Sequence, residues 1–351
     1  MKVLLGMSGG IDSSLSAFLL KKEGWEVTGV TFQMIDKKNT KDLDDAKAMA
    51  ETIGIPHFVL DVRKEFQTLI MDYFAGEYFE GRTPNPCAVC NLNIKFKLLA
   101  EKADELGIQK IATGHYAKII ETPEGFRLTQ SKDEKKTQEY FLGLLPPSSL
   151  QRILFPLSDY TKEEIRALAE KEGFSRVSNK SESQEVCFIP DNDYISFIKD
   201  YKGQEDQKGD ILSLSGKKVG EHSGFFKYTI GQRRGIGVGL GTPHFVVSVD
   251  AEKNQVVVGE KTAVEKKQMK VFLQNSFEPL NLSNQYFVKI RYRSKTAPCK
   301  IILFENNILT VEAETSFNAP APGQLAVFYD NQKTIVHAGT ILAFFEEKEM
   351  K

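Results

Sequence analysis

A glycine-rich segment near the N-terminus carries residue types that bind phosphate. GMSGGIDSS, residues 6–14, lies between a short apolar run and a helical pattern. Glycines allow a tight turn, and the N–H groups of a helix start favour an anion. The segment lacks the Gly-Lys-Ser/Thr of a Walker A loop, which suits it better to a leaving pyrophosphate than to γ-phosphate transfer. Asp12 could hold Mg²⁺ near the phosphates. The alternative is a plain helix cap after a glycine-rich turn.

Two cysteine motifs are suited to sulfur chemistry or to metal binding. GRTPNPCAVCN (81–91) contains Cys87 and Cys90, and SQEVCFIP (183–190) contains Cys187. Because two prolines favour a non-helical loop before an amphipathic helix, we expect Cys90 at the helix N-terminus, where the dipole activates a thiol. Three interpretations stay open at this point: buried small side chains, redox or sulfur chemistry, and a metal site with three thiolate ligands.

The composition excludes several classes of protein. The chain has 351 residues, of which 41% are hydrophobic and 26% charged, as in ordinary globular proteins. No window approaches the roughly 18 uncharged apolar residues of a membrane span, and the N-terminal apolar run is too short for a signal peptide. Four cysteines exclude a disulfide scaffold and favour a reducing, cytoplasmic location.

The formal net charge of −1 is unevenly distributed along the chain. Residues 1–200 have a net charge of −5, whereas residues 251–300 have a net charge of +6. A basic stretch of this kind can bind a polyanion. Charge alone nevertheless favours the simpler interpretation, an ordinary solvated surface.

The first half of the chain alternates short apolar runs with helical patterns. This alternation predicts a parallel sheet with helices on both faces, which binds ligands beyond the carboxyl ends of its strands. We expect strands at 2–6, 26–32, 57–62 and 110–113, and helices at 13–22, 42–53, 64–79, 91–106 and 161–172.

From about residue 208 the pattern changes to short alternating runs separated by glycine and polar turns. Such a pattern predicts antiparallel β-structure, as a barrel or a sandwich. The charged segment 261–270 looks like a boundary between two β-modules. The expected strands include 244–250, 255–260, 286–293, 299–305, 308–314 and 323–330.

SGGIDSS resembles the signature of the PP-loop ATP pyrophosphatases, which split ATP to AMP and pyrophosphate. Together with the other motifs, the chain resembles the tRNA-specific 2-thiouridylases, which replace O2 of the wobble uridine with sulfur. The resemblance runs through nearly the whole chain. The motifs occur in the order SGGIDSS, GRTPNPCAVCN, ATGHYA (112–117), SQEVCFIP, YTIGQRRGIGVG (228–239), RYR (291–293) and APGQLAVFYD (321–330).

The resemblance implies an architecture of three parts. A doubly wound parallel α/β domain of the PP-loop, adenine nucleotide α-hydrolase-like type is expected over residues 1–205, with the ATP-binding and catalytic roles. A small central β-rich domain that binds tRNA is expected over 206–266. A C-terminal β-barrel is expected over 267–351.

The resemblance also implies roles for the residues that match the family's motifs. Cys90 corresponds to the nucleophile and Cys187 to the cysteine that carries the persulfide. ATP binding is implied for Gly6, Met7, Ser8, Gly9, Gly10, Ile11, Asp12, Ser13, Met34 and Gly114. Contact with the target base or the tRNA is implied for Asn85, Pro86, Cys87, His115, Lys136, Thr137, Gln138, Arg291, Tyr292 and Gln324.

The implied reaction uses ATP and Mg²⁺ to adenylate the uridine oxygen. A persulfide on Cys187 then delivers sulfur, and Cys90 attacks the remaining S–S bond, so that a reductant must reset the pair. The implied partners are the tRNA anticodon stem-loop and a cysteine desulfurase or sulfur-relay protein. We expect a cytoplasmic monomer without a membrane partner.

The sequence departs from the family pattern at several positions. Cys87 stands where many members have aspartate, and Lys136-Thr137-Gln138 stands where the family has Lys-Asp-Gln. A thiol at residue 87 leaves open a thiolase with a [4Fe–4S] cluster on Cys87, Cys90 and Cys187. Two further alternatives are another PP-loop ligase acting on a small molecule and a non-catalytic tRNA-binding module with metal on its cysteines.

Overall fold

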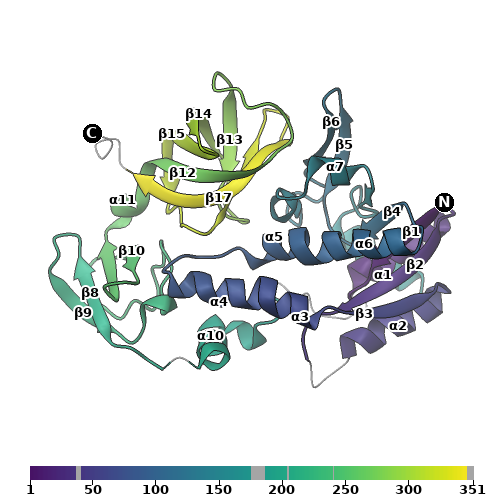
Figure 1. Ribbon diagram of the computed structural model, residues 1–351, viewed down its shortest axis with the longest axis horizontal. Helices are drawn as coiled ribbons and strands as arrows, with labels where there is room; N and C mark the ends of the chain where they lie inside the picture. The colour runs from purple at the N-terminus through teal and green to yellow at the C-terminus, as the bar shows by residue number, and fades with distance from the viewer. Residues whose placement is uncertain (37–40, 175–185, 204, 240, 346–351) are drawn as a thin grey trace. The chain divides into compact units, whose positions relative to one another are not determined.

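The computed structural model describes residues 1–36, 41–174, 186–203, 205–239 and 241–345 (Figure 1). The chain folds as two compact units. The first comprises Met1–Ile70, Cys87–Gln184 and Gln332–Val336, and the second comprises Met71–Pro86, Glu185–Asn331 and His337–Lys351. Within the described ranges, no helix combines the length and the apolar character that crossing a membrane requires.

A five-stranded parallel sheet forms the core of the first unit, in the order β3-β2-β1-β4-β7. The central strand β1 is apolar throughout its middle because it is covered on both faces: Val3, Leu4 and Leu5 are fully buried. The parallel sheet expected from strand–helix alternation is therefore confirmed. The strands are β1 (Lys2–Gly6), β2 (Glu26–Gln33), β3 (His57–Asp61), β4 (Lys110–Thr113) and β7 (Ile153–Leu154).

Helices cover this sheet from both sides. On one face α1 (Ile11–Lys22), α2 (Lys41–Ile53) and α8 (Lys162–Lys171) share an apolar core with Val3 and Leu5. Leu4 points to the opposite face because side chains alternate along a strand, and α6 (Lys97–Glu105) packs against β1 and β4. The remaining elements of this unit are the hairpin β5 (Lys118–Thr122) and β6 (Gly125–Thr129), the 3₁₀ helix η3 (Glu139–Leu142) and α7 (Pro147–Leu150).

Two helical runs differ in how well the sequence predicts them. The run expected over 64–79 is present as α3 (Arg63–Phe66), η1 (Gln67–Met71) and α4 (Asp72–Phe79). The run expected to start at residue 91 starts earlier, as α5 (Pro86–Cys90) followed by η2 (Asn91–Phe96) and α6. Proline is tolerated in the first helical turn because its missing N–H has no partner there. The placement of Cys90 at a helix N-terminus is therefore wrong.

The second unit contains a four-stranded sheet in the order β10-β11-β8-β9. Two of its three strand pairs, β10 with β11 and β8 with β9, are antiparallel, but β11 and β8 run parallel, so the expectation of purely antiparallel structure is wrong at this pair. The strands are β8 (Gly209–Ser213), β9 (Lys218–His222), β10 (Phe245–Asp250) and β11 (Gln255–Gly259); the helical segments are η4 (Pro190–Asn192), α10 (Tyr194–Lys202) and η5 (Phe225–Lys227).

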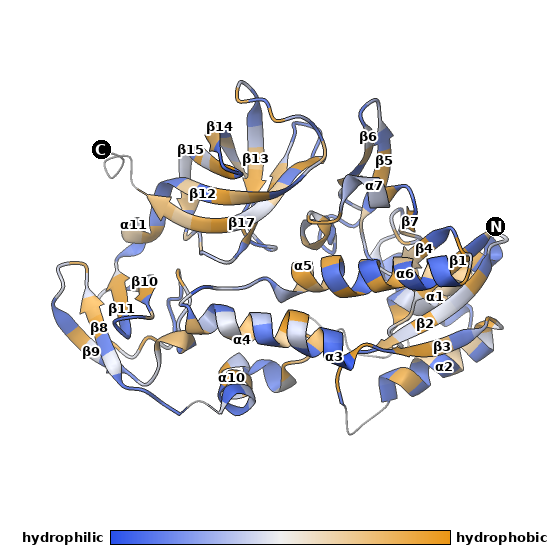
Figure 2. Cartoon of the chain, viewed as in Figure 1, coloured by the Kyte–Doolittle hydropathy of each residue, from blue (hydrophilic) through white to orange (hydrophobic). Residues whose placement is uncertain are grey.

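Six further strands close into a barrel in the order β12-β15-β14-β13-β16-β17. Its interior is filled by buried side chains such as Val271, Ile301 and Phe328. In Figure 2, β12 and β17 show hydrophobic stretches in orange, interrupted by paler or blue residues. The expected C-terminal barrel is confirmed. The strands are β12 (Glu265–Ser276), β13 (Gln285–Lys289), β14 (Ala297–Glu305), β15 (Ile308–Asn318), β16 (Leu325–Tyr329) and β17 (Ile335–Phe345).

The charged segment 261–270 lies between the four-stranded sheet and the barrel, as expected for a boundary between two β-modules; it consists of α11 (Lys261–Val264) and the start of β12. One local expectation in this region needs correction. The strand expected over 286–293 ends at Lys289, and Arg291 lies in a turn closed by a hydrogen bond from the Ser294 N–H to the Arg291 carbonyl of 3.0 Å. The turn is required because the antiparallel partner β14 begins only eight residues later, at Ala297.

Candidate active site

The glycine loop lies at the carboxyl ends of two neighbouring central strands. β1 ends at Gly6, which is in register with Thr113 at the end of β4, and α1 begins at Ile11. Gly9 has a φ of +70°, and a Cβ at this position would collide with the backbone oxygen of Asp42 in α2. Only glycine adopts this positive φ without strain and also leaves space for the Asp42 oxygen. The loop can therefore lie in close contact with the start of α2.

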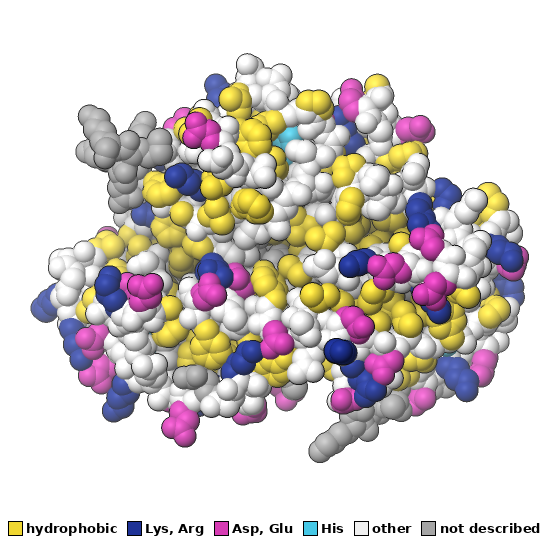
Figure 3. Space-filling view, viewed as in Figure 1, with side chains coloured by type: hydrophobic (Ala, Val, Ile, Leu, Met, Phe, Trp, Pro, Cys, Tyr) yellow, Lys and Arg dark blue, Asp and Glu magenta, His cyan; other side chains and the backbone are white. Residues whose placement is uncertain are grey.

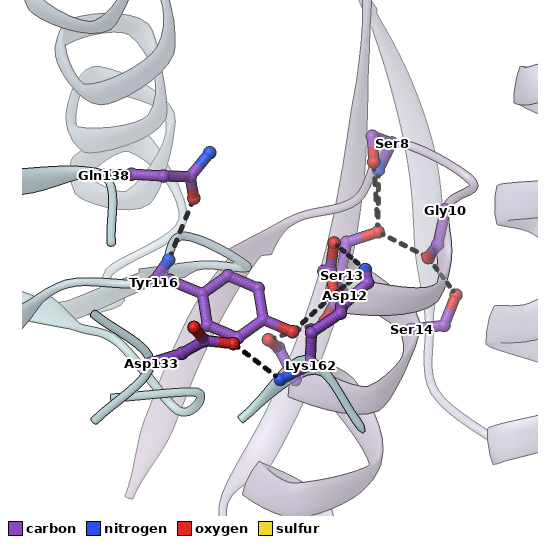
Figure 4. A network of polar contacts seen from close by, with 10 residues as sticks. Ser8, Gly10, Asp12, Ser13, Ser14, Tyr116, Asp133, Gln138 and Lys162 are labelled. Carbon is purple, nitrogen blue, oxygen red and sulfur yellow. Dashed lines mark hydrogen bonds and ion pairs between the residues drawn. The ribbon is translucent and has the colours of Figure 1, made fainter. Parts of the chain in front are cut away.

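Serine hydroxyls hold the loop in shape (Figure 4). The Ser8 N–H donates to Ser13 Oγ over 3.1 Å, and the Ser13 and Ser14 hydroxyls donate to the Gly10 carbonyl over 3.2 and 2.9 Å. Gly10 is the N-cap of α1 and has no side chain that could accept from the first N–H groups of the helix. The start of α1 is thus arranged to receive an anion.

Other residues expected to bind ATP lie at the same edge of the sheet. Gly114 follows β4, and a Cβ there would lie 2.8 Å from the Ser13 nitrogen and 2.9 Å from the Asp12 carbonyl carbon. Met34 is half-buried just beyond the carboxyl end of β2, which pairs with β1. The fold therefore gathers the loop, Gly114 and Met34 at the sheet edge where doubly wound folds bind ligands.

A buried lysine pairs with the acidic residue of the loop. Lys162 Nζ lies 2.6 and 2.8 Å from the two carboxylate oxygens of Asp12, and only 3% of Lys162 is exposed. The Tyr116 hydroxyl donates to the same carboxylate over 2.8 Å, and the Lys162 ammonium lies 5.9 Å from the centre of the Tyr116 ring. Asp12 is therefore held by two donors from two different segments (Figure 4).

Asp133 fixes the start of α8, from which Lys162 projects. One oxygen of the Asp133 carboxylate accepts from the Lys162 N–H over 3.0 Å, and the other accepts from the N–H groups of Lys135 and Lys136, each over 3.1 Å. A reciprocal capping box between Thr161 and Glu164 closes the same helix end. The backbone of Lys162 is thus anchored independently of its side chain.

The expected tRNA-contacting triplet is connected to this network. Gln138 Oε1 accepts from the Tyr116 N–H over 2.9 Å, and the Gln138 N–H donates to the Tyr116 carbonyl over 2.6 Å. Thr137 is 3% exposed, and its hydroxyl donates to Glu139 over 2.6 Å, while Lys136 is half-buried. A chain of contacts therefore runs from Gln138 through Tyr116 to Asp12.

His115 lies half-buried beside the loop. Its Nδ1 is 2.8 Å from the Thr113 hydroxyl, and its ring centre lies 5.7 Å from that of Phe96 and 6.3 Å from that of Phe155. Burial, aided by the charge of Lys95, lowers the pKa of His115 to about 3. The imidazole is therefore neutral at neutral pH and offers a flat ring rather than a cation.

The four cysteines occupy different environments, and all carry thiols. Cys87 is half-buried and Cys90 is buried in α5, three residues apart on one helical turn. Cys187 is exposed in a turn, next to the buried Phe188, and Cys299 is buried in the barrel. Residues 183–185 of the second motif lie outside the described residues.

The described side chains can be examined for their ability to hold a metal ion. Among the residues that the structure describes, no three His, Cys, Asp or Glu side chains gather into a metal site. A single carboxylate at Asp12 fits Mg²⁺, which proteins commonly bind through one carboxylate together with substrate phosphates.

A second cluster of expected site residues lies in the second unit. Asn85 Nδ2 donates to Gln324 Oε1 over 3.4 Å, and Gln324 Nε2 donates to the Pro84 carbonyl over 3.3 Å. The Thr83 N–H donates to the Pro322 carbonyl over 2.8 Å. The loop before α5 and the loop before β16 are thus joined by several hydrogen bonds, although 239 positions separate Asn85 from Gln324.

Arg291 makes hydrogen bonds within the second unit. Its Nη2 donates to the carbonyls of Ile230 and Ala319 over 2.8 and 2.9 Å. Tyr292 lies beneath the ammonium of Lys289, 5.6 Å from Nζ to the ring centre. Arg291 therefore connects the segment before β10 to the end of β15.

Family comparisons cover nearly all of this framework. The model of a tRNA methyl transferase HUP domain matches residues 1–191, that of its PRC-barrel domain matches 195–260, and that of an aminomethyltransferase beta-barrel domain matches 263–341. A protein named tRNA-specific 2-thiouridylase MnmA from Geobacter metallireducens is 41% identical over 354 residues, with 95% of each chain covered. The chain belongs to the tRNA-specific 2-thiouridylase MnmA family.

Further members of the MnmA family are equally similar. The MnmA of Lachnoclostridium phytofermentans is 39% identical, with 97% of this chain and 99% of that protein covered. The MnmA of Treponema denticola is 42% identical, with 94% of each chain covered. The similarity is therefore not limited to the phosphate loop but includes the β-rich half of the chain.

Three residues of the candidate site were not assigned a role from the sequence: Lys162, Tyr116 and Asp133. One signal was present for Lys162. The expected helix 161–172 carries a lysine in its first turn, where the helix dipole favours acidic residues instead. Tyr116 lies within the motif ATGHYA, but only the fold brings its hydroxyl to Asp12 and brings Asp133 to the start of α8.

Several basic side chains of residues 251–300 have acidic or aromatic partners. Lys253 pairs with Asp250 over 3.0 Å and Lys261 with Glu265 over 3.5 Å, while Lys266 lies over the ring of Phe344. On the face drawn in Figure 3, basic and acidic side chains are intermixed. These contacts agree with the simpler interpretation of a solvated surface.

Proposed function

We propose that this protein is an ATP-dependent tRNA-uridine 2-sulfurtransferase that thiolates the wobble uridine of tRNA anticodons. The observation that carries the proposal is the uncapped start of α1 behind a glycine loop, at the carboxyl edge of a parallel sheet. This arrangement suits a pyrophosphate leaving group, and two cysteine motifs supply thiols for the second half of the reaction. The names of the relatives point to the same substrate.

The first step is adenylation of the uridine. O2 of the base attacks the α-phosphorus of ATP, an O–P bond forms, and pyrophosphate leaves. Residues Gly6 to Ser13 bind the phosphates, while Met34 and Gly114 complete the nucleotide site. Mg²⁺, when bound near Asp12, would neutralise phosphate charge. The poor leaving group at C2 is thereby converted into AMP.

The second step transfers sulfur. The terminal sulfur of a Cys187 persulfide attacks C2, a C–S bond forms, and AMP leaves. The Cys90 thiolate then attacks the Cys187 sulfur, which releases 2-thiouridine and leaves a disulfide between the two cysteines. A thiol reductant supplies the two electrons that restore both thiols. The exposure of Cys187 suits a residue that must receive sulfur from another protein.

The remaining site residues position the RNA in this proposal. The cluster of Asn85, Pro86 and Gln324, together with Cys87, meets the target base, which single-stranded RNA can splay out of its stack. His115, Lys136, Thr137, Gln138, Arg291 and Tyr292 contact the tRNA. The sulfur donor is a cysteine desulfurase or a relay protein, and the enzyme acts as a cytoplasmic monomer.

The decisive experiment measures 2-thiouridine formation and iron content in the same anaerobically purified samples. With ATP, Mg²⁺, tRNA and a persulfide donor, the wild type should be active without iron. Cys90→Ser and Cys187→Ser should each abolish thiolation but retain tRNA binding, whereas Cys299→Ser, as the matched control, should remain active. Activity that tracks iron would replace the persulfide route by a cluster on Cys87, Cys90 and Cys187. Turnover of a small carboxylate without any 2-thiouridine would instead indicate a different PP-loop ligase.

A further inference from the structure

We propose that Phe188 is a positioning residue for sulfur transfer, because its buried ring fixes the place of the neighbouring Cys187 on the surface. The ring contacts α4 and α10, whereas the thiol one residue before it stays exposed. The inference rests on the proposed function in taking Cys187 as the residue that carries the persulfide.

The turn that carries Cys187 exposes this side chain and buries the next two. Phe188 is only 6% exposed and Ile189 only 8%. A hydrogen bond of 3.0 Å from the Ile189 N–H to the Val186 carbonyl closes the turn. Surface turns are usually built from polar residues, glycine and proline. Two buried apolar side chains directly after the cysteine therefore tie this turn to the interior of its unit.

The Phe188 ring contacts one aromatic ring from each of two helices. Its centre lies 5.4 Å from that of Phe74 in α4 and 5.2 Å from that of Phe197 in α10. Both contacts are edge-to-face, with interplanar angles of 89° and 65°, an arrangement that aromatic side chains prefer. Because each contact depends on the direction of the ring, the two together hold Phe188 in one orientation.

The two helices that hold this ring are themselves joined, and α10 lies alongside α4 in Figure 1. Tyr194, the first residue of α10, stacks on Tyr78 of α4 with ring centres 4.8 Å apart. At the other end of α10, Asp72 of α4 accepts a hydrogen bond from the Tyr201 hydroxyl over 3.2 Å and pairs with Lys202 over 2.6 Å. The Phe188 ring therefore packs against a framework that is fixed at both ends of α10.

A thiol that carries a persulfide has two opposing requirements. It must be accessible, so that it can receive sulfur from another protein, and it must also reach the reacting carbon in one defined geometry. Exposed turns are more mobile than the elements that they connect. Since consecutive Cα atoms are only about 3.8 Å apart, a fixed Phe188 confines the backbone of Cys187 and leaves its side chain exposed. The buried ring of Phe188 thus meets both requirements.

The first test follows the mobility of residue 187 without any reaction. A nitroxide spin label is attached to Cys187 in a chain whose other three cysteines are replaced by serine, and its electron paramagnetic resonance spectrum is recorded. The label should be more mobile after Phe188→Leu, because leucine lacks the ring that makes both edge-to-face contacts. The matched control is Phe328→Leu, which removes a buried ring from the barrel of the same unit and should leave the spectrum unchanged.

The second test measures the consequence for sulfur transfer. The wild type and both variants, with their cysteines intact, are loaded with persulfide and mixed with ATP, Mg²⁺ and tRNA for a single turnover. Phe188→Leu should form 2-thiouridine about 10- to 100-fold more slowly, as expected for a misplaced reacting group. Its persulfide content, its release of pyrophosphate and the alkylation rate of Cys187 should not fall below those of the wild type. Phe328→Leu should thiolate like the wild type.

A loss of folding is recognised in the same samples. Cys299 is buried in the barrel and should stay unlabelled by iodoacetamide as long as the protein is folded. Slow thiolation by Phe188→Leu without labelling of Cys299 is therefore not caused by unfolding.

The outcomes separate the inference from the proposed function. An unchanged spectrum in folded Phe188→Leu would overturn the role of Phe188, even if the wild type thiolates tRNA. Equal slowing of thiolation in Phe188→Leu and Phe328→Leu would also overturn it, because the loss would then follow stability. A more mobile label in Phe188→Leu, with a wild type that makes no 2-thiouridine, would support the anchor and reject the proposed reaction.

Discussion

Gly114 lies so close to Ser13 that a Cβ at residue 114 would be 2.8 Å from the Ser13 nitrogen. The contact joins the carboxyl end of β4 to the first turn of α1, two segments that adjoin because β1 and β4 pair in parallel. It explains the glycine in ATGHYA, because the backbone of α1 occupies the space that a side chain would need. The proposed nucleotide site therefore depends on packing between β4 and α1.

The first prediction concerns this contact. Gly114→Ala should lower the free energy of unfolding by about 1–3 kcal/mol, the usual cost of overpacking, because the nearest atoms belong to backbone and cannot rotate away. It should also weaken ATP binding, since α1 must shift. Urea unfolding and ATP titration measure the two effects. Gly76→Ala in α4 is the control, because no atom lies within 4 Å of a Cβ built there. An ATP affinity equal to that of the wild type would show that the loop tolerates the shift.

A second prediction concerns pH. Folding lowers the pKa of His115 from 6.5 to about 3, so between these values the unfolded state binds more protons than the folded state. The contribution of His115 to stability is therefore complete above pH 6.5 and is lost as the pH falls toward 3. The slope should be at most about 1.4 kcal/mol per pH unit within this window.

Comparison with His115→Asn isolates this effect. The variant should show a flatter decline of the unfolding free energy between pH 6 and about 4 than the wild type does. Denaturant unfolding at a series of pH values measures it. Parallel curves for the two proteins would mean that His115 is already solvated in the folded state.

The third prediction concerns the order of cysteine alkylation in the native protein. Cys187 is exposed and should react first with iodoacetamide at pH 8. Cys299 is buried in the barrel, and burial raises its pKa to about 12, so it should react only after unfolding. Peptide mass spectrometry over a time course distinguishes the sites. Early labelling of Cys299 would contradict its burial.

The fourth prediction separates two roles of Arg291. Because its guanidinium bonds the Ile230 and Ala319 carbonyls, Arg291→Ala should lower the free energy of unfolding by about 1–3 kcal/mol. If Arg291 also contacts tRNA, the variant should bind tRNA more weakly and with a smaller salt dependence.

The neighbouring Arg293→Ala serves as the control, because Arg293 is exposed. It should leave the unfolding free energy nearly unchanged. Filter binding at several salt concentrations, performed well below the unfolding temperature, gives the salt slope for each variant. An unchanged slope for Arg291→Ala would assign the residue to structure alone.

The sequence by itself determined the features that depend on neighbouring residues. The continuous apolar run at Val3, Leu4 and Leu5 predicted a buried strand, and alternating runs predicted β-structure as a barrel or a sandwich, of which the structure has a barrel. The glycine loop and the cysteine motifs were visible as short patterns. These features could be predicted because hydrophobic periodicity and turn-forming residues act over only a few positions of the chain.

Tertiary structure decided the features that join distant residues. It paired Lys162 with Asp12 across 150 positions and Asn85 with Gln324 across 239, and it made β8 and β11 parallel. It also ended β13 before Arg291 and started a helix at Pro86. None of these features follows from local propensity. Each depends on which distant segment packs against the residue in the folded protein. The residues of the proposed phosphate site could thus be identified from the sequence, but the pairing of Lys162 with Asp12 could not.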